Sequence, residues 1–151
     1  MPPASLIDGR AIARQLQGEL VQRVAALRAA GIQPGLAFVR VGEDAASKVY
    51  VGRKEKTCAE LGIYSEIHVL PEATGEAELL GLLARLNADS RLHGVLVQAP
   101  LPSQLRATVI YASVRPEKDV DGFHPVNVGK LMLGDSEGRR PKSEVGNQSD
   151  I

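Results

Sequence analysis

The sequence predicts an α/β domain: a layered, mostly parallel sheet of three or more strands with flanking helices. Apolar segments typical of strands alternate three times with amphipathic helical segments that are long enough to connect parallel strands. The length of 151 residues is close to the common size of a single domain. In such a sheet the ligand crevice lies beyond the carboxyl ends of the strands. We therefore expect the loops after Gly42, Pro71 and Gln98 to line the site.

Each expected element has its own sequence pattern. Apolar residues that recur every three or four positions indicate helices, and short apolar runs or alternation with a period of two indicate strands. Glycine and proline mark most of the ends. In chain order, the expected elements are a helix over residues 8–30, a strand over 36–42, a helix over 45–61, a strand over 64–70, a helix over 75–88, a strand over 94–98, a helix over 104–113 and a short helical segment over 126–133.

Capping residues support several of these boundaries. Side chains of Asp, Ser and Thr accept hydrogen bonds from the free N–H groups of a first helical turn, and glycine is common just after a last turn. The expected N-caps are Asp8, Asp44, Thr74 and Ser103, and the expected stops are Gly31 and Gly62.

The last part of the chain differs in composition from the rest. Residues 135–151 contain Val145 and Ile151 as their only sizeable apolar residues. A segment with so little to bury does not offset the entropy that ordering costs. We therefore expect a folded domain over residues 1–134 and a polar, disordered tail over 135–151.

Composition and charge exclude several classes of function. Lys plus Arg and Asp plus Glu number 18 each, so no basic surface for nucleic acid or an anionic membrane is expected. Aromatic residues make up 3% of the chain, too few for a base-stacking platform. The sequence has neither a secretory signal pattern nor an apolar run near the ~18 residues of a membrane span, which predicts a soluble, cytoplasmic protein. Cys58 is the one cysteine and the histidines are scattered, so neither a disulfide nor a metal site is expected.

Ser47, Tyr50 and Lys54 form the first group that could carry chemistry. Spacings of three and four place these side chains on one face of the expected helix 45–61. A lysine beside a phenol on an inward face loses solvation, which favours the neutral amine and makes it a candidate for proton transfer. A surface lysine with its stem along Tyr50 explains the same spacing, and on spacing alone this simpler interpretation is favoured.

The Tyr-x-x-x-Lys spacing also occurs in short-chain dehydrogenases. Those enzymes need a glycine-rich dinucleotide loop near the amino terminus, and this chain has neither G-x-G-x-x-G nor G-x-x-x-x-G-K-[ST]. A relationship to short-chain dehydrogenases is therefore the weaker hypothesis.

Two further groups lie where strands and helices give way to loops. Gln98 ends an apolar strand, which would place a polar amide at the mouth of the crevice; a strand that simply ends at turn residues fits equally well.

Asp119 and Asp121 are two residues apart and followed by glycine. They could hold the polar edge of a ligand, whereas for a divalent cation the ligand count is too low. Taken alone, a solvated turn is the simpler interpretation of this pair.

Together and in this order, the three segments resemble one family. The resemblance rests on S-K-V-Y-V-G-R-K-E-K with L-G-I downstream, on G-V-L-V-Q-A-P-L-P and on K-D-V-D-G-F-H-P-V-N-V-G-K-L. These motifs closely resemble the bifunctional methylenetetrahydrofolate dehydrogenase/cyclohydrolase family, and the resemblance covers residues 6–134. It implies interconversion of 5,10-methylene-, 5,10-methenyl- and 10-formyltetrahydrofolate, with tetrahydrofolate derivatives as the partners.

The resemblance also implies a role for each matched residue. Tyr50 would stack on the folate ring system. Lys54 would be the general acid/base of the cyclohydrolase step, and Gln98 would hydrogen-bond and orient Lys54. Asp121 would hold the polar edge of the pterin, and Ser47 would be a weaker ligand contact.

The sequence departs from the family pattern near its end. Family members are nearly twice as long and continue with Cys-Thr-Pro and a dinucleotide-binding domain, whereas Lys-Ser-Glu follows Pro141 here. We therefore expect only the folate and cyclohydrolase half, without the C-terminal dinucleotide-binding domain. The full-length family implies NADP and a homodimer, whereas we expect no NADP or NAD to bind this chain. A folate-binding remnant without catalysis, or an interaction module, is the alternative function.

Overall fold

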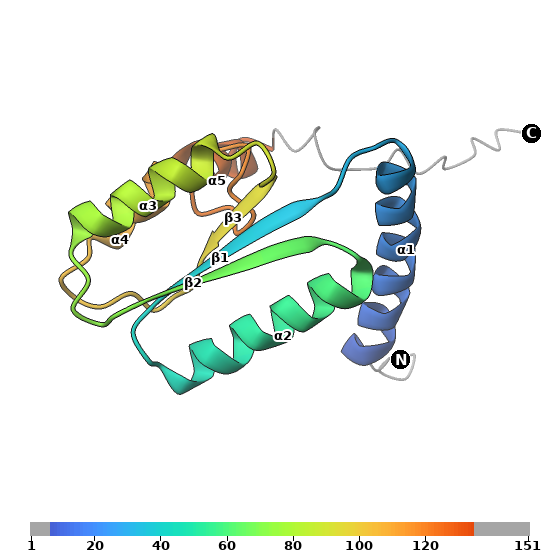
Figure 1. The fold of residues 1–151 in the computed structure, drawn as a ribbon, viewed down its shortest axis with the longest axis horizontal. Coiled ribbons are helices and arrows are strands. Elements are labelled where there is room, and N and C mark those ends of the chain that lie inside the picture. Colours follow the sequence, from blue (N-terminus) through green and yellow to red (C-terminus); the bar gives the residue numbers. More distant parts are fainter. Residues whose placement is uncertain (1–6, 135–151) are drawn as a thin grey trace, which may run out of the picture.

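The structure, a computed structural model, describes residues 7–134, and Figure 1 shows their arrangement. The predicted α/β class is confirmed within these residues. The expectation about the tail 135–151 lies outside them.

A three-stranded parallel sheet forms the centre of the fold. β1 (Gly35–Val41) lies between β2 (Tyr64–Leu70) and β3 (Gly94–Val97), so the strand order is β2-β1-β3. Both neighbours run parallel to β1, with Leu36 opposite Ser65 of β2 and opposite Gly94 of β3. All three strands therefore end at the same edge of the sheet.

Helices cover both faces of this sheet. α2 packs on one face, and α3 and α4 pack on the other, as Figure 1 shows. The helices of the described chain are α1 (Gly9–Ala29), α2 (Ala45–Leu61), α3 (Glu76–Ala88), α4 (Ala107–Ser113) and α5 (Pro125–Met132).

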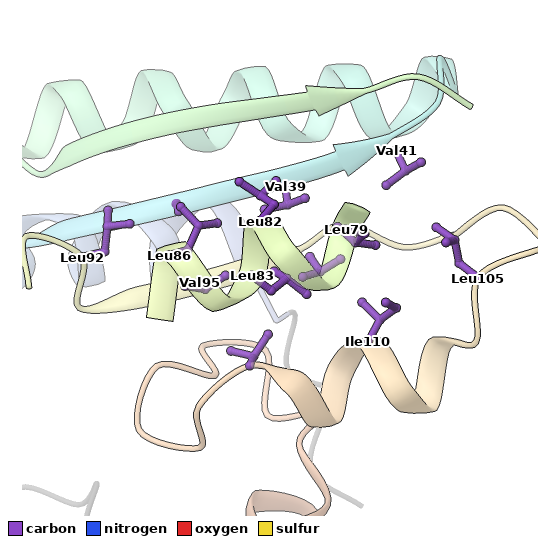
Figure 2. Packing of buried hydrophobic residues seen from close by; sticks show 13 residues of the cluster. Val39, Val41, Leu79, Leu82, Leu83, Leu86, Leu92, Val95, Leu105 and Ile110 are labelled. Atoms are coloured by element: carbon purple, nitrogen blue, oxygen red, sulfur yellow. The ribbon is translucent and has the colours of Figure 1, made fainter. Parts of the chain in front are cut away.

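The core has one part on each face, because successive residues of β1 point to opposite sides. Val39 packs with Leu83 of α3 and Ile110 of α4 in the larger cluster, which Figure 2 shows. Phe38 points the other way and packs with Val51 of α2 in the smaller cluster. These contacts hold the end of β1 at a fixed place beside the start of α2.

α1 lies largely outside these layers. It stands at the end of the sheet where the strands begin, as Figure 1 shows. Of the apolar residues whose spacing predicted this helix, only Val24 is buried, and the others are between 40% and 52% exposed. The exposed ones are Ile12, Leu16, Leu20 and Leu27.

Four of the expected capping residues are confirmed. The Asp8 carboxylate accepts hydrogen bonds from two first-turn N–H groups of α1, those of Arg10 and Ala11, and the Asp44 carboxylate accepts one from the Ser47 N–H of α2. Gly31 and Gly62 lie just beyond the last turns with φ of 79° and 73°, left-handed conformations that glycine adopts without steric cost.

Two other capping predictions are wrong. Thr74 is buried and makes no side-chain cap, and Gly75 is the N-cap of α3 instead. Ser103 does not begin α4, which starts only at Ala107. The reason is a contact from another element: the N–H of Arg106 donates to the carboxylate of Glu76 in the first turn of α3, at 3.0 Å.

No helix within residues 7–134 is long and apolar enough to cross a membrane. The same residues contain no group of three or more His, Cys, Asp or Glu side chains that could hold a metal ion.

Candidate functional site

The five residues that the resemblance singles out lie on three segments. Ser47, Tyr50 and Lys54 are on α2, which begins soon after β1 ends. Gln98 directly follows β3, and Asp121 lies in the loop between α4 and α5. The ends of β1 and β3 meet at one edge of the sheet, which is where parallel sheets usually bind ligands.

Lys54 and Gln98 are in direct contact. The Lys54 Nζ donates a hydrogen bond to the Gln98 Oε1 at 3.2 Å. The Gln98 side chain is held in turn, because its Nε2 donates to the Ala99 carbonyl at 2.8 Å. Its backbone N–H donates to the Val39 carbonyl at 2.8 Å, which continues the pairing of β3 with β1. The amide that accepts from Lys54 is therefore fixed at the end of β3.

Ser47 connects the start of α2 to the same segment. Its side chain is buried, and its Oγ donates to the Ala99 carbonyl at 3.3 Å. Its backbone N–H donates to the Asp44 carboxylate at 2.7 Å, and hydrogen bonding from Ser47 lowers the pKa of Asp44. Ala99 thus accepts hydrogen bonds from both Ser47 and Gln98, so the first turn of α2 and the end of β3 are held together.

Tyr50 has a different environment from the other two residues on α2. Its side chain is 56% exposed, whereas Ser47 is buried and Lys54 is half-buried. The three side chains predicted to share one helix face therefore differ in exposure: Ser47 lies in the core, and Tyr50 lies at the surface. The exposed ring is free to take a flat ligand against its face.

Asp121 lies near the Lys54 charge. Its side chain is exposed, but the protein atoms around it remove enough water to raise the pKa of its carboxyl, and the positive charge of Lys54 opposes that increase. A carboxylate beside a half-buried lysine, with an exposed aromatic ring on the same helix, can accept hydrogen bonds from a polar heterocycle.

Asp119 is the residue that the sequence prediction missed. It was considered with Asp121 as part of a solvated turn, but its side chain is buried. Burial acts to raise the pKa of the Asp119 carboxyl, and hydrogen bonds from Asn127 and three backbone N–H groups outweigh that effect, so the pKa is lowered. The sequence has no signal that separates Asp119 from Asp121, because both stand in a polar loop before glycine and the bridge to Val95 forms only in the fold.

The junction between β1 and α2 has carboxylates where the pyrophosphate of a nicotinamide dinucleotide would need free N–H groups. Phosphates bind where free N–H groups of a first helical turn meet a glycine-rich loop. At the start of α2 the Asp44 carboxylate already accepts from the Ser47 N–H of that turn. A Cβ on Gly42 would meet the Glu72 Oε2 at 1.8 Å, so a carboxylate fills the space beside that glycine as well.

Sequence similarity to known proteins covers most of the described chain. Residues 7–121 match the family described as tetrahydrofolate dehydrogenase/cyclohydrolase, catalytic domain. The bifunctional protein FolD of Geotalea daltonii is 54% identical over 131 residues, which are 87% of this chain and 47% of that protein. FolD of Moorella thermoacetica is 52% identical over 133 residues, 88% of this chain and 48% of that protein. The chain thus spans about half the length of the curated relatives it matches.

Solved structures resemble the fold over the same extent. The bifunctional methylenetetrahydrofolate dehydrogenase/cyclohydrolase FolD of Campylobacter jejuni has a TM-score of 0.84 and 44% identity, covering 86% of this chain and 46% of that chain. The Trypanosoma brucei dehydrogenase-cyclohydrolase, solved with NADP and an inhibitor, has a TM-score of 0.83 and 37% identity, covering 93% of this chain and 47% of that chain.

Proposed function

Because this chain belongs to the tetrahydrofolate dehydrogenase/cyclohydrolase family through the catalytic domain of that family, we propose that it binds tetrahydrofolate derivatives at the carboxyl edge of its sheet. There it hydrolyses the 5,10-methenyl form to 10-formyltetrahydrofolate. This is the cyclohydrolase half of the family's chemistry. No hydride-transfer step is included in the proposal, and carboxylates at the junction between β1 and α2 support leaving it out.

Lys54 is the proposed general acid/base. The methenyl substrate is a cation whose electrophilic carbon joins N5 and N10. Water adds to that carbon and gives a proton to the neutral Lys54 amine. As the bond from the carbon to N5 breaks, Lys54 returns a proton to N5, and the added hydroxyl gives its proton to solvent water, which leaves a formyl group on N10.

The other residues hold the lysine and the substrate in place. Gln98 accepts the hydrogen bond from Lys54 and so fixes the direction of its amine. Asp121 accepts paired hydrogen bonds from the aminopyrimidine edge of the pterin, and the Tyr50 ring stacks on its face. Ser47 sets the first turn of α2 and contributes a weaker contact.

The observation that carries this proposal is the hydrogen bond from Lys54 to Gln98 at 3.2 Å. It joins the one lysine of α2 that is half-buried to a residue at the end of β3, whereas Lys48 and Lys56 on the same helix are exposed. A proton-transfer group has to be held in place and partly withdrawn from water, and of these three lysines only Lys54 meets both conditions.

Hydrolysis of 5,10-methenyltetrahydrofolate tests the proposal, with each rate corrected for the uncatalysed reaction. Lys54→Met keeps the volume of the stem and removes the amine, so the enzyme-dependent rate should fall by about 10²–10⁴-fold. Lys56→Met is the matched control: Lys56 is exposed and pairs with Glu60 at 3.9 Å, so its loss should leave the rate unchanged. Equal rates for the wild-type and Lys54→Met chains would rule out Lys54 as the catalyst.

A folate-binding chain without catalysis is the alternative function, and it has its own readout. The chain spans about half the length of its relatives, so part of the wall around the ligand could come from outside it. Calorimetric titration with 5-formyltetrahydrofolate measures binding independently of turnover. Binding without hydrolysis would support the alternative, and the absence of both would contradict the proposal.

A further inference from the structure

The buried Asp119 carboxylate accepts four hydrogen bonds, three of them from backbone N–H groups of the turn that follows it. Its Oδ1 accepts from the backbone N–H groups of Gly122 at 3.1 Å and Phe123 at 3.2 Å. Its Oδ2 accepts from the backbone N–H of His124 at 2.9 Å and from the Asn127 Nδ2 at 2.8 Å. One side chain therefore draws residues 119–124 into a closed turn.

The backbone of this turn is fixed to the sheet. Asp119 forms a parallel bridge with Val95 of β3, and the Val95 N–H donates to the Lys118 carbonyl at 2.7 Å. The Lys118 Nζ in turn donates to carbonyls at the end of α3, so the segment is held on two sides. The acceptors are the carbonyls of Leu86 at 3.2 Å, Asn87 at 2.8 Å and Asp89 at 2.8 Å.

Asn127 connects this closed turn to α5. Besides its bond to Asp119, its Nδ2 donates to the Pro116 carbonyl at 2.8 Å. It therefore connects the residues before the turn to the first turns of the helix after it. The Asp119 carboxylate and the Asn127 amide together fix both ends of the segment that carries Asp121.

We propose that Asp119 is a positioning residue, whose carboxylate closes the turn that carries Asp121 and so sets where the Asp121 carboxylate lies. Asp121 lies inside the closed turn, and its own carboxylate is exposed while that of Asp119 points inward. Gly122 at the turn has φ of 74°, a left-handed conformation that lets the N–H groups of residues 122–124 converge on one acceptor. Without the Asp119 carboxylate these N–H groups hydrogen-bond to water instead. The turn then no longer fixes the position of Asp121.

Asp119→Glu tests this proposal, because it keeps the charge and changes only where the carboxylate lies. The ligand part of the test rests on the proposed function and uses 5-formyltetrahydrofolate in calorimetry. Asp119→Glu should weaken binding by about tenfold, the size of one lost hydrogen bond to a charged group. In an Asp121→Asn background the same change should cost no more than about twofold, since coupled residues are not additive. Equal losses in both backgrounds would overturn the proposal, because a merely structural role does not act through Asp121.

A second readout is independent of folate. The carboxyl carbon of Asp121 is followed by NMR as a function of pH in the wild-type and Asp119→Glu chains. If Asp119 positions Asp121, the titration midpoint should shift toward the ordinary value for an exposed aspartate, since the protein atoms that raise it no longer surround it. An unchanged midpoint in a folded Asp119→Glu chain would overturn the proposal. If the wild-type chain binds no folate, this titration still decides the role of Asp119, while the proposed function fails separately.

Two further variants complete the experiment. Glu117→Asp is the matched control, because Glu117 is an exposed carboxylate on the same segment that pairs with Arg115, and its displacement should change neither readout. If Asp119→Glu does not fold, Asn127→Ala replaces it. That variant removes one of the four donors, keeps the Asp119 charge and should shift both readouts in the same direction by a smaller amount.

Discussion

Two aspartates two residues apart have opposite environments in this protein. The Asp119 carboxyl has a lowered pKa because hydrogen bonds outweigh its burial, whereas burial raises the pKa of the Asp121 carboxyl. The sequence treats them alike, since both stand in a polar loop before glycine. Only the bridge between Asp119 and Val95 determines which carboxylate points inward. The motif could therefore predict the segment. Which of the two carboxylates is buried depends on a contact with a distant strand.

A carboxylate in place of the Gln98 amide should impair the proposed base. Gln98→Glu puts a negative charge next to the Lys54 amine, and a nearby opposite charge opposes the loss of a proton from it. We expect hydrolysis of the methenyl form to fall by about tenfold or more, with the melting temperature nearly unchanged. Gln17→Glu, on the exposed surface of α1, is the control and should have no effect. Wild-type rates in Gln98→Glu would contradict the role given to Gln98.

Acid should destabilise the fold through Asp119. Its pKa is lowered below 3.8 in the folded chain, so the unfolded chain takes up this proton first as the pH falls. The stabilisation is complete above the unfolded value and is lost as the pH falls through the folded one. Glu76 and Asp89, whose pKa values arginine partners lower to about 2, act in the same direction.

Urea unfolding between about pH 5 and pH 2 measures this dependence. We expect the free energy of unfolding to decrease steadily over that range in the wild-type chain. Asp119→Asn should be less stable at the upper end, because it loses an acceptor, and should decrease less steeply, because one titrating group is gone. An equally steep decrease in both chains would exclude Asp119 as a contributor.

The helices show what local sequence can predict and what it cannot. The bounds of α2, from Ala45 to Leu61, follow from the Asp44 cap and the Gly62 stop, which both act within one turn of the helix end. The start of α4 does not follow from Ser103, because a carboxylate on α3 captures Arg106. The exposed apolar face of α1 has the periodicity of a buried helix and is nevertheless open within residues 7–134. Periodicity therefore predicted that a helix exists, but not what covers it.

Replacing the glycine at the end of α2 should destabilise the whole domain. Gly62 has φ of 73°, and a Cβ there would lie 3.1 Å from the Arg28 Nη1 of α1. Gly62→Ala should lower the free energy of unfolding by about 1 kcal/mol, because a side chain disfavours left-handed backbone. Gly52→Ala, inside the same helix with nothing within 4 Å of a Cβ, should instead raise it by about 0.5 kcal/mol. Urea unfolding of both variants checks the difference in sign, and destabilisation of equal size in both would contradict it.

For the molecule as a whole, the fold brings together residues that no single element contains. Lys54 comes from α2, Gln98 from the end of β3 and Asp121 from the loop before α5, and the parallel order β2-β1-β3 sets two of these segments at one edge. The order of motifs along the chain was enough to predict the family, because three long segments rarely occur together by chance. It was not enough to predict Asp119 or the shared acceptor at Ala99, since both depend on tertiary contacts.

The charge around the strand–helix junctions predicts that NADP does not bind to this chain. At the start of α2 the Asp44 carboxylate accepts from the Ser47 N–H, and Glu72 fills the space beside Gly42, so a pyrophosphate would meet carboxylates there. We expect calorimetry at about 0.15 M salt to detect no NADP binding in the micromolar range. The Trypanosoma brucei relative, which was solved with NADP, is the positive control under the same conditions. Micromolar binding to this chain would contradict the prediction and would locate a phosphate site that these junctions do not provide.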